Sequence, residues 1–288
     1  MDLNTFRRER LRPYQETTLR AITLDGYDRK WSVHVEGSVG REELSAITPE
    51  GLETWRASIP TRGARDAAWA VVRGALRRAV RWGYIDLDPT RRVECGRAPV
   101  RLKAPVLDAS GIRDLLRSLW GHELEGWVCL MAGCGLRPEE ASAAEWRAVD
   151  WRSGRYHVGS VVHWVSGVEH VERPKTELSE RDVWIPRPLL LRLRQVRRPA
   201  GRVLGGLTHQ QASARLKRHC SRCGLRWVPP KDLRHSWATV AVASGVDISV
   251  VSRYLGHSDI STTARYYLHH EDAVLREASR TVGQALLE

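Results

Sequence analysis

The sequence predicts a mainly α-helical protein with a small antiparallel β-sheet, an α+β fold in two domains. Three observations support this: a length of 288 residues, helical spacing of apolar residues over the first hundred, and rough alternation over residues 155–185. We place one domain at residues 1–98, a basic linker at 99–107 and a second domain at 108–288.

Two helices carry the prediction for the first domain. Thr48 should cap a helix that begins at Pro49, and its apolar face comprises Leu52, Trp55 and Ile59. Residues 62–82 form a second amphipathic helix that ends at Gly83, with an apolar stripe and an arginine-rich remainder. Residues 95–105 then combine prolines, a glycine and cations without periodicity, which is typical of an exposed linker.

The second domain should begin with helices over residues 109–119 and 123–133. Residues 155–185 are rich in Val, Trp and Tyr around a Ser166-Gly167 turn, which predicts the antiparallel strands. From Pro188 a helical pattern resumes and continues to the end of the chain.

The net charge of +12 comes almost entirely from arginine, because only five of the 46 basic residues are lysines. Planar guanidinium groups match phosphate oxygens two at a time, so this excess suits nucleic acid, although GC-rich coding produces the same bias. No apolar run reaches the roughly 18 residues of a membrane span, and the first twenty residues lack a signal peptide. We expect a cytoplasmic protein without a membrane partner.

The five cysteines are expected to be thiols, since an odd count in a reducing compartment builds no disulfide framework. His219, Cys220 and Cys223 resemble half of a zinc site, but the other cysteines supply no second pair at a matching interval. We therefore expect structural thiols and no metal.

Charged residues in apolar surroundings mark three candidate segments. Arg137 follows a glycine-broken apolar helix, and Glu140 stands one turn later, where it can hold the arginine or form an ordinary ion pair. Lys231, Arg234 and His235 open a helix, where cations oppose the macrodipole unless an anion binds. Lys175 lies in a tight turn between two strands, solvated or reaching into a cleft.

Four motifs in this order resemble the catalytic domain of the tyrosine recombinases, the phage integrase family: "GLRPEE", "PKTELSERDVWIP", "KDLRHSWAT" and "LGHSDISTTARYY". The likeness is strong over residues 105–270. Residues 20–90 are similar, more loosely, to the helical core-binding domain of that family. The twenty-odd residues before that region are fewer than we expect for the arm-binding domain that many phage integrases carry, so the chain either acts on simple sites or is truncated.

The resemblance implies a role for each matched residue. Arg137 and Arg234 clamp the scissile phosphate, and Glu140 is the acidic partner of Arg137. Lys175 protonates the departing 5′ oxygen, and His257 hydrogen-bonds the same phosphate.

In the family pattern the nucleophile follows this histidine by nine residues, so the resemblance implies that Tyr266 is the nucleophile and Tyr267 its neighbour. Adjacent helical residues point about 100° apart, so only one of the two can face the phosphate.

Lys231 stands where the family usually has histidine. A lysine with the ordinary pKa of about 10.4 is a poor general base unless burial and neighbouring arginines lower that value, so we expect Lys231 to stabilise charge. The acceptor of the tyrosine proton stays open.

The resemblance implies a site-specific DNA recombinase that cleaves and rejoins strands through a 3′-phosphotyrosyl intermediate, without metal, ATP or another cofactor. A type IB-like topoisomerase and a non-cleaving helix-turn-helix protein are the alternatives. The implied partners are double-stranded DNA, other copies of the chain in a tetramer, and a directionality or architectural protein. The last helix, after residue 270, either packs on its own domain or is donated to a neighbouring subunit.

Overall fold

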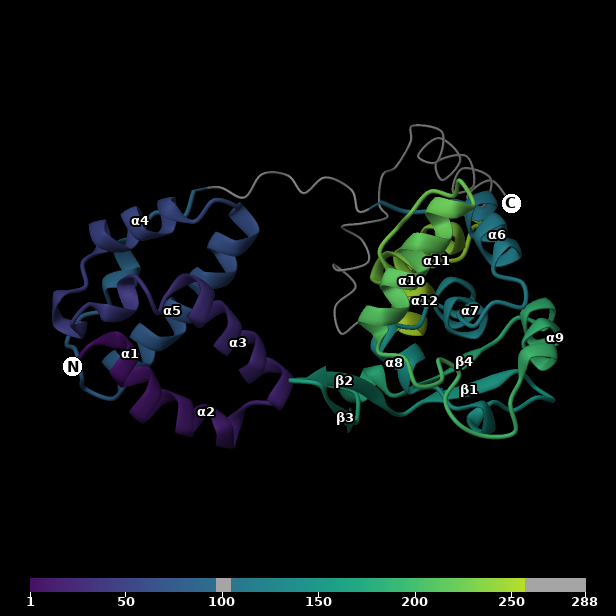
Figure 1. Cartoon of the computed structure of the whole chain (residues 1–288), viewed down its shortest axis with the longest axis horizontal. Helices are drawn as coiled ribbons and strands as arrows, with labels where there is room; N and C mark the ends of the chain where they lie inside the picture. Colours follow the sequence, from purple (N-terminus) through teal and green to yellow (C-terminus); the bar gives the residue numbers. More distant parts are fainter. Residues whose placement is uncertain (97–104, 257–288) are drawn as a thin grey trace, which may run out of the picture. The chain divides into compact units, whose positions relative to one another are not determined.

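The computed structural model describes residues 1–96 and 105–256. Contacts divide the chain into two compact units, Met1–Arg101 with Trp164–Val168, and Leu102–His163 with Glu169–Glu288 (Figure 1). Helices dominate both units and the strands are few and short, so the predicted fold class is confirmed. His257, Tyr266, Tyr267 and the last predicted helix lie outside the described residues.

The first unit is helical. Its elements are α1 (Leu3–Phe6), a π-helical segment (Arg7–Leu11), α2 (Arg12–Thr18), α3 (Ala21–His34), α4 (Pro49–Ser58) and α5 (Arg62–Arg81). Apolar side chains from α1, α3, α4 and α5 form one buried core, to which Phe6, Trp31, Leu52 and Leu76 contribute.

The two helices predicted here are confirmed. Thr48 caps α4 by accepting a hydrogen bond from the Gly51 amide at 3.1 Å, and the predicted apolar face is buried. Helix α5 buries the stripe that includes Ala68 and Val72, and it presents arginines such as Arg73 to solvent. Gly83 follows α5 with φ of +75°, a conformation that glycine adopts without strain.

The second unit is built around α7. Its helices are α6 (Ala109–Ser118), α7 (Glu125–Cys134), α8 (Pro138–Ala143), α9 (Arg187–Val196), α10 (His209–Arg222), α11 (Pro230–Ala243) and α12 (Ile248–Leu255). Helix α7 packs against α6, α8, α9 and α11 and is almost entirely buried, as its sequence, apolar after Glu125, requires (Figure 1). Leu107, at the end of the predicted linker, is buried in the same core.

Within residues 1–96 and 105–256, four strands form two separate pairs rather than one sheet. Strands β1 (Arg155–Val158) and β4 (Arg181–Trp184) pair antiparallel, and β2 (Val161–Val165) pairs with β3 (Val168–Glu172). The predicted turn joins β2 to β3, with positive φ at both Ser166 and Gly167. In the β1–β4 pair, Val158 lies opposite Arg181 and Tyr156 opposite Val183, so these residues share the buried face.

Two local predictions are wrong. Residues 197–208 are not helical: Gly201 and Gly205 adopt positive φ there, and Val203 and Leu204 are buried from an irregular segment. Lys175 does not lie in a tight turn. It belongs to the connection between β3 and β4, which contains a 3₁₀ turn at Glu177–Ser179 and joins strands of different pairs.

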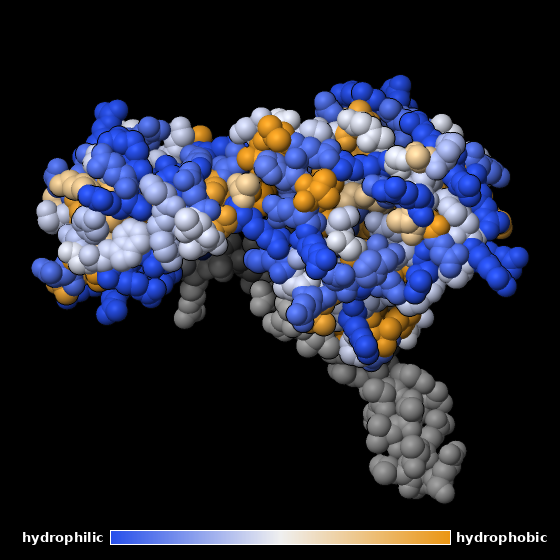
Figure 2. Space-filling model, turned by 90° about the horizontal axis from the view of Figure 1, so that it is seen from below, coloured by the Kyte–Doolittle hydropathy of each residue, from blue (hydrophilic) through white to orange (hydrophobic). Residues whose placement is uncertain are grey.

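The surface is consistent with the hydrophilic composition. Hydrophilic side chains cover most of the face seen in Figure 2, with apolar ones interspersed. Within residues 1–96 and 105–256, every helix is too short or too polar to cross a membrane.

Candidate active site

Glu140 is the centre of the candidate site, and local sequence places Arg137 beside it. Gly135 ends α7 in the left-handed conformation, and Pro138 starts α8 two residues after Leu136. The Arg137 amide donates to Glu140 Oε2 at 2.9 Å, and Arg137 Nη1 donates to Oε1 at 2.6 Å. One carboxylate therefore caps the helix and holds the side chain of Arg137.

Arg234 reaches the same carboxylate from the first turn of α11. Its Nη1 lies 3.8 Å from Glu140 Oε2. It also donates to the carbonyl oxygens of Gly135 at 2.9 Å and Leu255 at 2.5 Å, at the ends of α7 and α12. Arg234 thus satisfies helix-end carbonyls while its charge faces Glu140.

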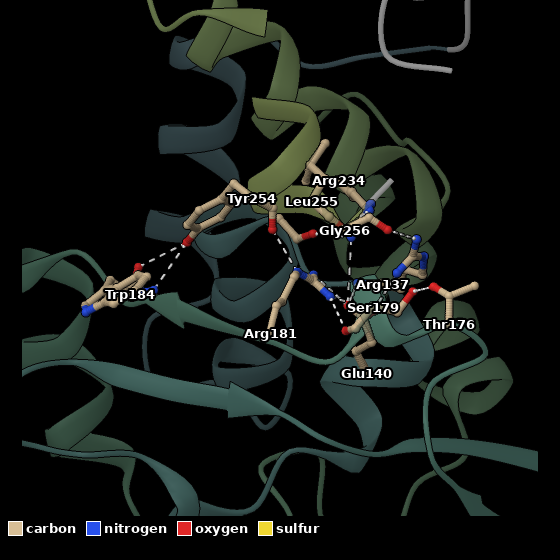
Figure 3. A network of polar contacts seen from close by, with 11 residues as sticks. Arg137, Glu140, Thr176, Ser179, Arg181, Trp184, Arg234, Tyr254, Leu255 and Gly256 are labelled. Atoms are coloured by element: carbon tan, nitrogen blue, oxygen red, sulfur yellow. Dashed lines mark hydrogen bonds and ion pairs between the residues drawn. The ribbon is translucent and has the colours of Figure 1, made fainter. Parts of the chain in front are cut away.

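A third arginine, Arg181 of β4, completes the network and was not predicted (Figure 3). Its two terminal nitrogens donate to the two oxygens of Glu140 at 3.1 and 3.0 Å. The sequence carried a signal for it, because Arg181 precedes the apolar Val183 by two residues and so shares the inward face of the strand.

The site combines one buried carboxylate with three guanidinium groups. Burial by itself disfavours the charged form of Glu140, but the hydrogen bonds and charge of Arg181, followed by the charges of Arg234 and Arg137, lower its pKa to about 2. Glu140, Arg181 and Arg234 are enclosed, whereas the Arg137 side chain is 34 % exposed. The network holds excess positive charge and presents one guanidinium to solvent, which suits a phosphate ligand.

The predicted lysines lie at the surface. Lys175 and Lys231 are exposed, and no hydrogen bond joins either ammonium group to Glu140 in the part of the chain that the structure describes. The segment of Lys175 is nevertheless tied to the network, because Thr176 hydrogen-bonds Ser179 at 2.9 Å and the Ser179 carbonyl accepts from Arg181 at 3.0 Å.

No group of three His, Cys, Asp or Glu side chains could hold a metal ion in residues 1–96 and 105–256. Cys220 is buried, Cys223 is exposed, and the Cys223 thiol lies 3.7 Å from His219 Nε2.

Gly256 connects this network to His257, the next residue along the chain. It ends α12 with φ of +70°, and its carbonyl accepts from Arg137 Nη2 at 3.5 Å. A Cβ atom at Gly256 would lie 2.5 Å from the Leu178 carbonyl oxygen. Only glycine fits where the end of α12 meets the segment after Lys175.

Gly256→Ala should therefore destabilise the protein by about 3 kcal/mol, because it adds a backbone clash to the strain of positive φ. Gly245→Ala is the matched control, since Gly245 has φ of +85° and nothing within 4 Å of its Cβ position. The control should lose about 1 kcal/mol. Chemical denaturation measures both, and equal losses would contradict the clash.

The chain aligns with tyrosine recombinases from several bacteria. The XerC-like tyrosine recombinase of Caldanaerobacter subterraneus subsp. tengcongensis is 29% identical, with 55% of this chain aligned to 48% of that protein. The chain thus spans about half the length of that relative. Tyrosine recombinase XerC of Myxococcus xanthus is 30% identical over 68% of each chain. Tyrosine recombinase XerD of Ralstonia nicotianae is 28% identical over 93% of this chain and 88% of its own.

Solved structures show the same fold. The Tn1549 transposon integrase in complex with transposon right end DNA superposes with a TM-score of 0.82 at 14% identity, over 98% of this chain and all of that one. A lambda integrase tetramer bound to a Holliday junction superposes with a TM-score of 0.69 at 14% identity, over 94% of this chain and 79% of that one.

The profile of the phage integrase family matches residues 112–273, a segment that contains Arg137, Glu140 and Arg234. Fold, site and relatives define a tyrosine recombinase. The chain belongs to the phage integrase family.

Proposed function

We propose that this recombinase acts on specific sites in double-stranded DNA and cleaves one strand at a time through a 3′-phosphotyrosyl bond to Tyr266. The observation that carries the proposal is the convergence of Arg137 and Arg234, from different segments, on one buried carboxylate, with Arg137 open to solvent. A phosphodiester repels nucleophiles through its negative charge, and paired guanidinium groups offset that charge.

Each site residue then has one task. The Tyr266 oxygen attacks phosphorus and loses its proton to a base, the bond to the 5′ oxygen breaks, and Lys175 protonates that oxygen. Arg137, Arg234, Lys231 and His257 stabilise the charge on the transition state, and Glu140 aims the arginines. The phosphotyrosyl bond retains the energy of the broken linkage, so rejoining needs no nucleotide.

The assembly follows from the same chemistry, because exchange joins two duplexes and each supplies two strands. The proposed working form is a homotetramer on DNA in the cytoplasm, with the tail after residue 270 either donated to a neighbouring subunit or packed on its own domain.

The N-terminal helical unit is the proposed core-binding domain, which binds DNA beside the cleavage site. A directionality or architectural protein assists on some sites. Arginines on the exposed side of α5, such as Arg73 and Arg77, supply positive charge for this role.

A trapping experiment tests the proposal. The full chain first selects its site from a randomised duplex library, and the selected site is rebuilt with a nick close to the cleavage position. An adduct that survives denaturation is expected, and bound but uncleaved DNA would favour the helix-turn-helix alternative. Substrates with two selected sites should yield exchanged products. Relaxation of supercoiled DNA without exchange would instead indicate a topoisomerase.

A further inference from the structure

Arg181 donates four hydrogen bonds within the network. Beyond its paired bonds to Glu140, its Nε donates to the Tyr254 carbonyl at 2.7 Å, and Nη1 also donates to the Ser179 carbonyl at 3.0 Å (Figure 3). The side chain is 8% exposed. Each of its three nitrogens thus donates to a protein acceptor, and little of the group can reach a ligand.

The acceptors of Arg181 belong to three different segments. Glu140 lies in α8 and holds Arg137. Ser179 closes the segment that carries Lys175 and is bonded to it through Thr176. Tyr254 lies in the last turn of α12, two residues before Gly256 and three before His257. Arg181 is therefore bonded to three of the four segments that lead to proposed ligands of the phosphate, the fourth being α11 with Lys231 and Arg234.

We propose that Arg181 is a positioning residue for cleavage: it fixes the segments of Arg137, Lys175 and His257 relative to one another without touching the phosphate. This inference rests on the proposed function. It assigns a role to Arg181, which lies in the same motif as Lys175 but is not among the predicted site residues. A displacement of about 1 Å at a reacting group can cost about 100-fold in rate, so such a residue has a large effect from outside the reaction.

The electrostatics of Glu140 supply a readout that a purely structural role would not move. Four groups face this carboxylate: Arg137 at the start of α8, Arg181 of β4, Arg234 of α11 and Tyr156 of β1, whose pKa is raised by burial and then by Glu140. Without Arg181, burial remains and the main opposing contribution is lost, so the pKa of Glu140 rises. As the pH falls, Glu140 in a protein without Arg181 is therefore protonated, and releases Arg137, at a pH where Glu140 of the native protein is still ionised and still holds Arg137.

The test uses the full chain, the nicked substrate at saturating concentration and the rate of adduct formation. Arg181→Met should cleave about 100-fold more slowly than the native protein, with DNA affinity unchanged within about threefold. The acid limb of its pH profile should move up by at least about one pH unit. Arg181→Lys keeps the positive charge but lacks the planar guanidinium group that bonds both oxygens of Glu140. It should cleave about tenfold faster than Arg181→Met.

Arg155→Met is the matched control, since Arg155 lies on the neighbouring strand, is 57% exposed and pairs with Asp182 at 3.5 Å. It should cleave at the native rate. If Arg181→Met cleaves at the native rate with an unmoved acid limb while Arg137→Ala does not cleave, the inference is wrong and the proposed function stands. If Arg137→Ala also cleaves normally, the proposed function fails. Should Arg181→Met not fold, Arg181→Lys decides, because a native rate in that variant overturns the inference.

Discussion

Tyr266→Phe should abolish covalent attachment to the nicked substrate, lowering the adduct yield by at least about 1,000-fold. Phenylalanine has the same ring but lacks the oxygen that bonds to phosphorus, so the variant cannot form the phosphotyrosyl bond. The measurement is the fraction of labelled DNA that stays with the protein under denaturing conditions. DNA binding by the variant should stay native, because the arginines that meet the phosphate are unchanged.

Tyr267→Phe is the matched control, since it removes the same atom one residue away. On a helix the two side chains point about 100° apart, so only one of them can approach a phosphate held by Arg137. The control should attach within about threefold of the native yield. An adduct in Tyr266→Phe together with none in Tyr267→Phe would transfer the nucleophile to Tyr267.

Much of the fold followed from local signals in the sequence. The helix after Thr48 has its cap, its proline and its apolar spacing within a dozen residues, so nothing distant was needed to place it. Residues 197–208 show the opposite case. Their apolar residues are buried by contacts with remote segments, including the bridge between Arg202 and Glu145, and such contacts impose no periodicity on the sequence.

The contact between Arg137 and Glu140 could be predicted from the sequence, whereas the contact between Arg181 and Glu140 could not, because only the tertiary structure joins those two residues. Arg137 and Glu140 are three residues apart, so helix geometry alone brings them together. Arg181 is 41 positions along the chain from Glu140, and the two meet only in the tertiary structure, in which β4 pairs with β1. An arginine on the buried face of a strand was the available signal, because a charge there needs a partner.

Arg137→Ala should lower the rate of adduct formation by about 1,000-fold while leaving the fold almost intact. Arg137 is the most exposed guanidinium of the network and supplies the charge that can reach a phosphate. Its loss does not strand Glu140, which keeps two bonds from Arg181 and lies 3.8 Å from Arg234. Single-turnover cleavage and chemical denaturation of the same preparation measure the two effects, and the stability loss should stay within about 1 kcal/mol.

Two further variants test whether the effect on cleavage rate can be separated from the effect on stability. Arg147→Ala removes an arginine whose side chain is 76% exposed and pairs with Glu145 beyond α8, so both rate and stability should stay native. Arg234→Met should lose both, because its removal leaves the Gly135 and Leu255 carbonyls without their donor and a buried carboxylate with less positive charge, at a cost of about 3 kcal/mol. If Arg137→Ala unfolds as readily as Arg234→Met, then Arg137 is part of the scaffold and its slow cleavage says nothing about the phosphate. A folded Arg137→Ala that binds DNA but cannot cleave it would separate the charge that acts on the reaction from the charges that hold the site together.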